Sequence, residues 1–298
     1  MPNHLYARPA SHLLSGVARV ADLLSDNAAD LSRTARFLRG YLQFQVRPQD
    51  IFLSSYPRSG TTWLQYILHV LVHDGDSGFR HIAQVAPWFE RNLSLGRCQA
   101  DDFEGLRSPR IFKSHLPLHW LPKGARYIYI ERDGRDVALS YYHFYRSHLG
   151  YQGDLDEFFD QFLCGNLQYG SWFKHTAGFR RLLGRPDLLL LQYEALLDDL
   201  PGQMHRIANF CGLKHSPARI TALSELCRFT RMKRDQERFD HAAGEGVRPV
   251  LPGQFIRKGS RGDHRSALST TQMAAFKARR TTPFRHPEQE WNLAAFLH

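Results

Sequence analysis

The sequence predicts an α/β protein: a single domain, residues 1–298, with a central parallel sheet and helices on both of its faces. Two observations lead to this fold class. Short, continuously apolar runs recur along the chain, and each has sequence of helical periodicity after it or close by. Neither an internal repeat nor a low-complexity linker divides the sequence. Apolar strands that alternate with helices are typical of a parallel sheet covered on both sides.

The N-terminal residues 1–45 are expected to form a helical extension. Two short amphipathic helices are predicted within 11–43, because apolar residues recur there at helical spacing. They are Leu13, Leu14, Val17, Val20 and Leu24, followed by Leu31, Ala35, Leu38 and Leu42. An amphipathic N-terminus can lie on a membrane or pack on its own domain, and we expect the second arrangement.

The strands and helices of the core follow in alternation. The first strand lies in "DIFLSSYP", and a helix is predicted over 61–74. The other strands are predicted at 110–115, 126–132 and 187–193, and further helices at 133–147, 155–163, 171–183 and 194–211. Residues 234–265 are rich in glycine, proline and charge, with little periodicity. A loop of this length in a compact domain is usually functional or mobile.

Composition limits the classes of protein and partner. Hydrophobic residues make up 43% of the chain and aromatic residues 12%, which indicates a globular protein and excludes a disordered one. The formal net charge of +10 favours an anionic partner. It does not choose between nucleic acid, a membrane surface and a small phosphorylated ligand.

Cysteine usage and hydropathy indicate the cellular compartment of the protein. The four cysteines are scattered without metal-ligand spacing, which indicates reduced, mostly buried thiols: Cys98, Cys164, Cys211 and Cys227. The opening residues hold no apolar run long enough for a signal peptide, and no later stretch approaches about 18 uncharged apolar residues. We therefore expect a soluble, cytoplasmic protein without a membrane span.

The turn "SYPRSGTTW" has the character of a phosphate-binding loop. It follows an apolar strand and opens an amphipathic helix, so the N–H groups of residues 59–62 would face an anion at a helix N-terminus. Gly60 permits close backbone approach, and Arg58 adds a guanidinium where a lysine is usual. The loop lacks the GK[ST] ending of a Walker A sequence. A strand–helix turn that is merely capped by Ser or Thr is the alternative.

Two further segments suit an anion. "YIERDGRDVALSYYHFYR" ends a strand with Arg132 and opens a helix that carries Ser140 about two turns along. "QFIRKGSRGDHRSALS" is irregular, basic and glycine-rich. A basic glycine loop by itself is more often a solvated surface. Three such segments in one α/β domain favour an anion-binding site.

Together these segments resemble the cytosolic-type sulfotransferases, which use 3′-phosphoadenosine 5′-phosphosulfate (PAPS) as the sulfuryl donor. "YPRSGTTW" is similar to their donor loop, "RDGRDVALSYYHFY" to their 3′-phosphate segment, and "FIRKGSRGDHR" to their RKGxxGDWK signature. "IFKSHLPLHWLP", "YGSWFKH" and "LLQYEALLDD" match further family segments. The resemblance runs from about residue 50 to about residue 270. Kinases and other P-loop NTPases fit less well, because the Walker lysine and the carboxylate for Mg²⁺ are missing from their sequence contexts.

The resemblance implies a donor site. The 5′-phosphosulfate would be held by Arg58, Ser59, Gly60, Thr61 and Thr62. The adenine would stack between Trp63 and Phe229 and bond to Tyr193, although both stacking residues could equally be core aromatics. The 3′-phosphate would be bound by Arg132, Ser140, Arg257, Lys258 and Gly259.

Lys113 and His115 are the expected catalytic pair. They are two residues apart in "FKSHLP", so in a strand their side chains point to the same face. His115 would accept the proton of the acceptor as general base, while Lys113 and Arg58 would stabilise the charge that develops. A sulfuryl group carries less charge than a phosphoryl group, so we expect no metal cofactor.

The sequence departs from the family at several positions. His264 replaces the signature Trp, which we expect to loosen the packing of that loop. "RSALSTTQMA" stands where the dimerisation pattern is usual, so a dimer is not implied. Cys227 and Arg228 occupy positions where hydroxyl residues are common, which affects one expected nucleotide contact.

The acceptor is the least defined part of the site. Residues 84–92, Phe144 and the loop around 240–252 are expected to line its pocket, with Trp88, Phe89 and Phe144 as apolar or aromatic surface. We expect a small hydroxylated molecule, with a glycan or an amine as alternatives. A non-catalytic basic module that binds nucleic acid or adenosine phosphates is the competing function, but it leaves Lys113 and His115 without a role.

Overall fold

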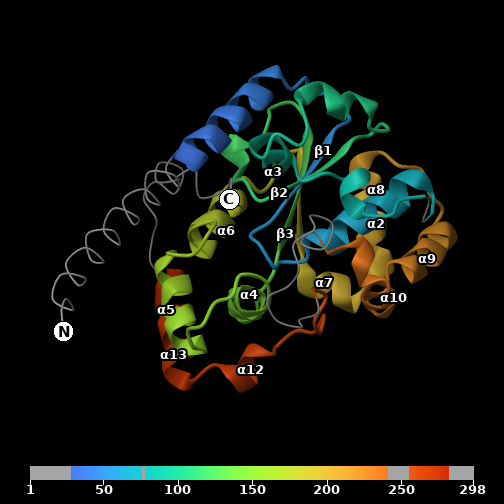
Figure 1. Cartoon of the computed structure of the whole chain (residues 1–298). Coiled ribbons are helices and arrows are strands. Elements are labelled where there is room, and N and C mark those ends of the chain that lie inside the picture. The colour runs from blue at the N-terminus through green and yellow to red at the C-terminus, as the bar shows by residue number, and fades with distance from the viewer. Residues whose placement is uncertain (1–27, 76–77, 241–254, 282–298) are drawn as a thin grey trace, which may run out of the picture.

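The computed structural model describes residues 28–75, 78–240 and 255–281. Four strands form one parallel sheet in the order β2-β1-β3-β4 (Figure 1). Their bounds are β1 Ile51–Ser54, β2 Ile111–Ser114, β3 Arg126–Glu131 and β4 Leu188–Gln192. The predicted strands are confirmed, each shorter by one or more residues at its ends.

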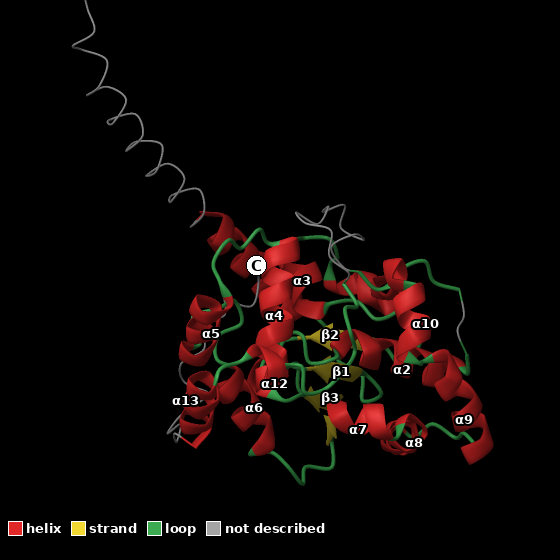
Figure 2. Cartoon of the chain, turned by 90° about the horizontal axis from the view of Figure 1, so that it is seen from below, coloured by secondary structure: helices red, strands yellow, loops and turns green. Residues whose placement is uncertain are grey.

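Helices cover both faces of the sheet, as predicted (Figures 1 and 2). One face carries α4 Gly134–His148, α5 Leu155–Cys164, α6 Trp172–Arg180 and α13 Thr270–Thr281. The other carries α2 Thr61–His73, α7 Tyr193–Asp198, α8 Leu200–Cys211, α9 Pro217–Leu226 and α10 Phe229–Arg234. The shorter elements are α3 Phe89–Ser94, α12 His264–Ala267 and the 3-10 turns Ile82–Gln84, Ala100–Gly105, Leu118–Trp120 and Gln236–Arg238.

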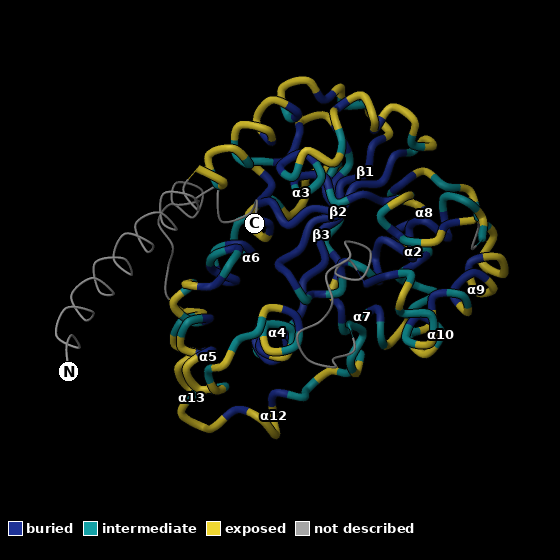
Figure 3. Tube along the Cα trace, viewed as in Figure 1, coloured by how far each residue is buried: buried dark blue, intermediate teal, exposed yellow. Residues whose placement is uncertain are grey.

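Alternating side chains give the two faces of the sheet different cores. Phe52, Phe112 and Tyr129 point into an aromatic cluster under α4, α5 and α6. Ile51 and Ile128 point the opposite way, into an aliphatic cluster with α2, α8 and α9. Successive residues of a strand face opposite sides, so one sheet serves both clusters. The strands β1 and β2 are accordingly buried throughout and β3 nearly so, whereas the edge strand β4 is partly exposed (Figure 3).

A buried ion pair fixes the amino ends of the two neighbouring strands β1 and β2. Arg110 and Asp50 are both 0% exposed, and the guanidinium donates to both carboxylate oxygens at 2.8 and 2.6 Å. A second carboxylate, that of Glu104, accepts from the same arginine at 2.6 Å. Bidentate pairing of this kind sets the register of the strands. This ion pair lies at the amino ends of the strands. The carboxyl ends lie at the opposite edge of the sheet.

The predicted helix 194–211 is divided in two. Asp199 lies outside helical geometry and its carboxylate accepts from Gly202 N–H at 2.9 Å, so it caps the start of α8. Pro201 follows in the first turn, where its missing N–H costs nothing. The helices α9 and α10 were not predicted from the sequence.

Part of the expected N-terminal extension lies within the described residues. A helix covers residues 28–43, whereas the helix expected around Leu13–Leu24 lies outside the described residues. The prediction of the inward face was wrong: Leu31 and Leu42 are 72% and 80% exposed, and Phe37 and Phe44 instead pack into the aromatic cluster. The rings of Phe37 and Phe44 bury more apolar area against the cluster than Leu31 and Leu42 would.

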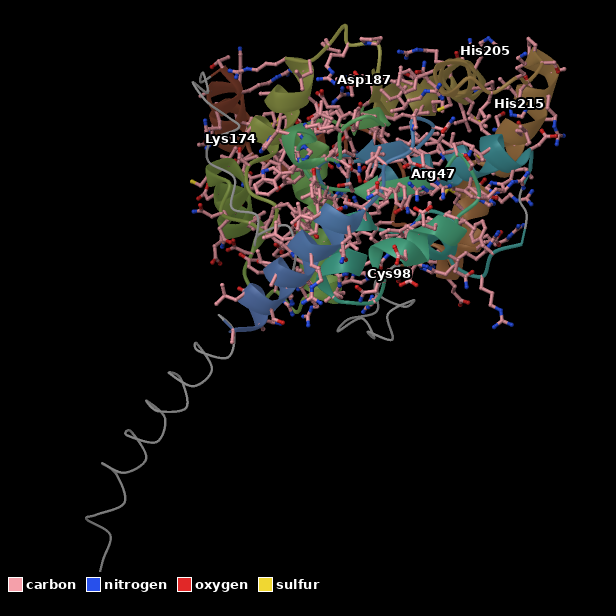
Figure 4. All side chains as sticks on the ribbon, turned by 90° about the horizontal axis from the view of Figure 1, so that it is seen from above. Arg47, Cys98, Lys174, Asp187, His205 and His215 are labelled. Carbon is pink, nitrogen blue, oxygen red and sulfur yellow. The ribbon has the colours of Figure 1, made fainter. Side chains whose placement is uncertain are left out.

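The remaining sequence expectations concern thiols and membrane helices. All four cysteines are free: Cys211 and Cys227 are buried, Cys98 is half-buried and Cys164 is exposed. None of the helices in the described ranges has the length and apolar character needed to cross a membrane. Figure 4 shows polar side chains all round the molecule, with Lys174 of α6 and His215 before α9 on opposite sides of the sheet.

Candidate active site

A cavity of about 850 Å³ lies at the carboxyl ends of the strands. Residues that come directly after β1, β2, β3 and β4 all reach it, among them Arg58, His115, Arg132 and Tyr193. Open parallel sheets bind their ligands at this edge. The predicted site residues that line the cavity are Arg58, Gly60, Thr61, Thr62, Trp63, Trp88, Lys113, His115, Arg132, Ser140, Phe144, Tyr193, Phe229, Arg257, Lys258 and Gly259.

The turn between β1 and α2 presents backbone donors to the cavity. Arg58 and Gly60 have left-handed φ angles of 67° and 101°. A Cβ at Gly60 would lie 2.7 Å from the Tyr193 ring, so only glycine fits there without a shift. No described side chain caps the start of α2, and its first turn holds no acidic residue. The first N–H groups and the helix dipole therefore remain available to an anion.

Ser59 lies in the wall of this turn and not on the cavity surface. It is 1% exposed, and its Oγ has no hydrogen-bond partner among the described residues. The neighbouring hydroxyls differ, because Thr61 Oγ1 is bonded to Ser55 Oγ. A buried hydroxyl without a partner costs free energy unless a ligand supplies one. The turn therefore contains one buried hydroxyl without a hydrogen-bond partner among the described residues.

Arg58 connects the turn to the neighbouring segments. Its Nε–H donates to Ser140 Oγ at 3.3 Å and a terminal N–H donates to Phe255 O at 3.1 Å. The guanidinium also lies over the rings of Phe144 and Phe255, at 4.9 and 5.2 Å from their centroids. Burial, with the nearby charges of Arg132 and Arg257, lowers the pKa of Arg58 to about 10. The group stays protonated near neutral pH, and an anion would relieve the repulsion.

The two segments expected at the 3′-phosphate meet at the cavity. Arg132 donates to Arg58 O at 3.2 Å and to Ser260 O at 3.0 Å, while its buried Nε–H has no partner among the described residues. On the loop, Arg257 pairs with Asp263 at 2.8 Å. Lys258 pairs with the same carboxylate at 3.3 Å. Cations from residues 132 and 257–258, about 125 positions apart in the chain, thus line one end of the cavity.

An aromatic slot lies beside these cations. The Trp63 ring packs edge-on against Tyr193, with centroids 5.6 Å apart, and its indole N–H donates to Cys227 O at 2.8 Å. Phe229 lines the same part of the cavity and leaves no room for a side chain at Gly259, where a Cβ would lie 2.0 Å from the ring. Flat faces fixed in this way suit a nucleobase.

The two departures next to this slot have different consequences. At Cys227 it is the backbone carbonyl that fixes Trp63, so this contact does not require a hydroxyl side chain. Arg228 is exposed and pairs with Glu225 at 2.5 Å. Its side chain is therefore directed to solvent.

His115 lies just beyond β2 and is only 4% exposed. Its Nδ1–H donates to Ser55 O at 2.7 Å, because a carbonyl can only accept; the lone pair is then on Nε2. Burial first, and then the charge of Lys113, holds the pKa of the imidazole well below its usual value. A neutral imidazole with a free lone pair is a competent proton acceptor at neutral pH.

Lys113 and His115 share a supporting residue that the sequence analysis missed. Glu90 is 0% exposed, and its Oε1 accepts from the indole N–H of Trp88 and from the backbone N–H of His115, each at 2.7 Å. Trp88 in turn lies under Lys113, whose Nζ is 3.8 Å from the ring centroid. Burial raises the pKa of Glu90. The sequence signal was an acidic residue directly after an apolar run, in "APWFERN".

A second missed residue is His175, from the "YGSWFKH" segment. It is 0% exposed, and its Nε2–H donates to His115 O at 2.9 Å. Its Nδ1 therefore accepts from the Tyr129 hydroxyl at 3.0 Å. Burial lowers the pKa of His175 to about 4, so it stays neutral. The backbone of His115 is thus fixed on both sides, by Glu90 at its N–H and by His175 at its carbonyl.

Aromatic residues also line the cavity near His115 and Lys113, the part expected to receive the acceptor. Trp88, Phe144 and Tyr169 line it, and Tyr169 packs edge-on against His115 with ring centroids 5.3 Å apart. Arg91, from the expected stretch 84–92, also contributes. So do residues that the sequence analysis did not assign, namely Asp30, His148, Leu149, Asn166, Leu167 and Gln168. Of the expected loop at 240–252, only Asp240 is described, with its carboxylate 3.9 Å from His148 Nε2.

The prediction that Phe89 lines this pocket was wrong. Phe89 is 0% exposed and packs in the aromatic cluster, with ring centroids 5.0 Å from Phe44 and 5.2 Å from Phe52. Trp88 is extended and Phe89 begins α3, so the two neighbours point in different directions. A sequence of two adjacent aromatics does not show which of them faces a cavity.

Metal binding receives no support within the described ranges, which hold no group of three or more His, Cys, Asp or Glu suited to an ion. The polar groups that converge on the cavity are chiefly cations and backbone N–H groups. This arrangement matches a polyanionic ligand better than a cation.

Comparisons with known proteins agree with this geometry. The profile described as "Sulfotransferase domain" matches residues 48–281. Sulfotransferase 2B1 of Mus musculus is 33% identical over 241 residues, 78% of this chain and 70% of that protein. Sulfotransferase 1A1 of Bos taurus is 31% identical over 245 residues, 79% of this chain and 83% of that protein.

Solved structures are similar over most of the chain. A retinol dehydratase in complex with androsterone and the inactive cofactor PAP has a TM-score of 0.71 and 25% identity, over 84% of this chain and 88% of that one. Mouse sulfotransferase SULT7A1 complexed with PAP has a TM-score of 0.65 and 25% identity, over the same shares. The fold, the profile and the sequence similarity agree, and the chain belongs to the sulfotransferase family.

Proposed function

We propose that the chain transfers a sulfuryl group from PAPS to a hydroxyl group of a small molecule and leaves adenosine 3′,5′-bisphosphate as the product. The observation that carries this proposal is that a neutral, buried His115 and the ammonium of Lys113 reach the same cavity as the phosphate loop. An amine is a second acceptor class that the same base can serve.

The described residues fit the donor. The start of α2 has no side-chain cap, and the cavity beside it is lined by the cations Arg58, Arg132 and Lys258. We assign the 5′-phosphosulfate to residues 58–62 and the adenine to the slot of Trp63, Tyr193 and Phe229. The 3′-phosphate is assigned to Arg132, Ser140, Arg257, Lys258 and Gly259. When bound, the donor supplies the sulfuryl group and a phosphate leaving group.

The proposed reaction is a single in-line displacement. His115 Nε2 takes the hydroxyl proton while the acceptor oxygen forms its bond to sulfur. The bond between sulfur and the bridging oxygen breaks, and its electron pair stays on the 5′-phosphate. Lys113 and Arg58 stabilise this developing charge. Because the sulfuryl group carries less charge than a phosphoryl group, we propose that these side chains act without a metal ion.

The acceptor end supports an apolar or aromatic substrate that carries a hydroxyl group. Trp88, Phe144 and Leu149 line it. Androsterone and retinol, the ligands in the complexes of the structurally similar retinol dehydratase, are molecules of this kind. Asn166 and Gln168 lie at the same cavity and can bond to a further polar group on the acceptor.

The remaining proposals concern the location and the partners of the protein. We propose that the protein is cytoplasmic and acts without nucleic acid. Its oligomeric state stays open, since "RSALSTTQMA" differs from the usual dimerisation pattern. The competing function, a non-catalytic module that binds nucleic acid or adenosine phosphates, gives no reason for the fixed His115 backbone.

Two assays test the proposal. Thermal shifts are measured with adenosine 3′,5′-bisphosphate, ATP and a short oligonucleotide, and the bisphosphate is expected to stabilise the protein most. Transfer from labelled PAPS is then measured over a panel of phenols, steroid alcohols and amines. An equal response to ATP contradicts 3′-phosphate recognition. Bisphosphate binding without transfer to any acceptor favours the non-catalytic module.

A further inference from the structure

We propose that His264 is a positioning residue for the donor: through Asp136 it fixes the loop of Arg257 and Lys258 against helix α4, which carries Ser140. This inference rests on the proposed function, since it concerns the 3′-phosphate of the donor. The structure thereby gives a role to the residue that replaces the signature Trp of the family.

The contact is made at a single buried carboxylate. Asp136, in the first turn of α4 and 2% exposed, accepts three hydrogen bonds from the loop. The donors are Gly262 N–H at 2.7 Å, His264 N–H at 3.1 Å and the ring Nδ1 of His264 at 2.7 Å. Two of these bonds come from the backbone and would exist with any residue at position 264. The third is specific to the imidazole.

The protonation of the ring follows from its partner. An ionised carboxylate only accepts, so Nδ1 of His264 carries the hydrogen. Nδ1 can carry it both in a neutral imidazole and in an imidazolium. The bond therefore does not depend on the ring being charged, and the proposed role is positional.

Other bonds also hold the loop. Residues 255–261 form neither helix nor strand. At one end, Phe255 O accepts from Arg58 at 3.1 Å; further on, Ser260 O accepts from Arg132 at 3.0 Å. At the other end, α12 begins at His264. In between, Lys233 Nζ donates to Arg257 O at 2.8 Å and Arg261 pairs with Asp198 at 2.6 Å. The bonds to Asp136 join the loop to α4, and each bond restricts backbone conformations that would otherwise oppose ligand binding.

The position of His264 determines where the phosphate-binding cations lie. Arg257 and Lys258 both pair with Asp263, the residue directly before His264. Holding His264 on Asp136 therefore holds Asp263 and its two cations close to α4. Ser140 lies one helical turn beyond Asp136 on that helix. Asp136 and His264 thus connect the two halves of the proposed 3′-phosphate site.

The replacement does not loosen the loop in the way that the sequence suggested. His264 is 4% exposed and is bonded through both its backbone and its ring. A directed bond to a carboxylate here takes the place of a larger ring. Such a bond is sensitive to the identity of the donor atom, which makes the proposal testable.

The test compares two substitutions in the full chain. His264→Phe keeps an aromatic ring but removes the donor, whereas His264→Asn loses the ring but places an amide N–H where Nδ1–H was. Dissociation constants are measured by calorimetry for adenosine 3′,5′-bisphosphate and for adenosine 5′-monophosphate, which lacks the 3′-phosphate. Melting temperatures and turnover at saturating PAPS are measured for each variant.

We expect His264→Phe to weaken bisphosphate binding by roughly 10-fold to 100-fold, the usual effect of losing a hydrogen bond to a charged group. Monophosphate binding should change by less than about 2-fold, and His264→Asn should restore most of the bisphosphate affinity. Turnover at saturating PAPS should fall less than the bisphosphate affinity, because the reacting atoms are elsewhere.

Three outcomes overturn the inference. If His264→Phe loses affinity equally for both nucleotides, the ring only supports the fold. If His264→Asn loses bisphosphate affinity and His264→Phe does not, the volume of the ring matters and the hydrogen bond does not. Unchanged bisphosphate affinity in His264→Phe removes the role altogether. If the wild-type protein itself does not prefer the bisphosphate to the monophosphate, the proposed function fails, and this result is distinguishable from the other three.

Discussion

The donor end and the acceptor end of the cavity are built by different interactions. At the donor end, three segments far apart in the chain meet through directed bonds, such as those from Arg58 to Ser140 and from Arg132 to Ser260. Ring contacts form the adenine slot, as between Trp63 and Tyr193, and the acceptor wall, as between Tyr169 and His115. Directed bonds fix individual atoms, while ring contacts mainly define a shape.

This difference indicates how each end recognises its ligand. A site of fixed cations and backbone donors discriminates by the number and position of phosphates, and the loss of one partner is costly. An apolar wall discriminates weakly, since one methylene more or less is worth about 1–3 kcal/mol. We therefore expect substitutions at the donor end and at the reacting atoms to have larger and more specific effects than substitutions at the acceptor end.

The largest effect is expected at the junction of the two ends. His115→Ala should lower turnover by about 10²–10⁴-fold, the usual contribution of a general base. Bisphosphate affinity should remain within about 3-fold of the wild-type value, because the imidazole acts on the acceptor. Turnover and calorimetric binding are measured on the same preparation. Retention of more than about a tenth of wild-type turnover would contradict the assignment of His115 as the base.

The pH dependence of the wild-type protein is a companion measurement. Because the folded-state pKa of His115 lies well below the usual value of about 6.5, the imidazole is already neutral at that pH. Turnover should therefore stay level from about pH 6.5 upward and fall only in more acidic solution. A rate that rises steeply between about pH 6.5 and 8 would show that the acting base has an unshifted or raised pKa.

The next largest effect is expected at Arg58, which touches both phosphate-binding regions. Arg58→Ala should lower the single-turnover rate by about 10²-fold or more and weaken donor binding less, since its charge matters most as the leaving group forms. Arg58→Lys should stay active, because a positive charge remains although the planar guanidinium is lost. Single-turnover rates are compared with donor affinities for the two variants. Weaker binding with an unchanged bound-state rate would make Arg58 a binding residue only.

A smaller and more selective effect is expected for the 3′-phosphate. Arg132→Ala and Arg257→Ala should each weaken bisphosphate binding by about 1.5–3 kcal/mol, while adenosine 5′-monophosphate loses much less. The two ligands differ only in the group that these arginines are proposed to bind. Calorimetry with both ligands measures the difference. Arg228→Ala, which removes an exposed arginine paired with Glu225, is the matched control and should change neither affinity.

The same contrast explains what the sequence could predict. Glycine, backbone donors and cations at strand ends have steric and electrostatic requirements that leave a readable pattern, so "SYPRSGTTW", Arg132 and residues 257–259 are found together at the cavity. The roles of Glu90 and His175 depend on bonds to the backbone of His115, which lies 25 and 60 positions away in the chain. Contacts of that kind are set by the tertiary fold and have no local pattern.

Aromatic residues were the least predictable. The alternation that places Phe52 and Phe112 on the aromatic face of the sheet can be recognised within each strand. Trp88 is extended and Phe89 begins α3, so no periodicity spans the two residues to show which ring is buried. The outward leucines of the helix over 28–43 show the same limit, because spacing identifies an apolar stripe but not its partner.

The smallest effects are expected at the acceptor end, where a matched pair separates the pocket from the core. Phe144→Leu should raise the acceptor KM by about 5-fold or less, since an apolar wall contributes little to discrimination. The donor KM should change less, although the ring also lies over the Arg58 guanidinium. Phe89→Leu removes ring contacts in the core, so it should reduce the free energy of unfolding by about 1.5 kcal/mol while both KM values stay within about 2-fold. Denaturant melts and steady-state kinetics with a phenol acceptor measure the two quantities. If Phe89→Leu instead changes the acceptor KM without a loss of stability, Phe89 contributes to the pocket. The aromatic cluster and the acceptor pocket are then not separate.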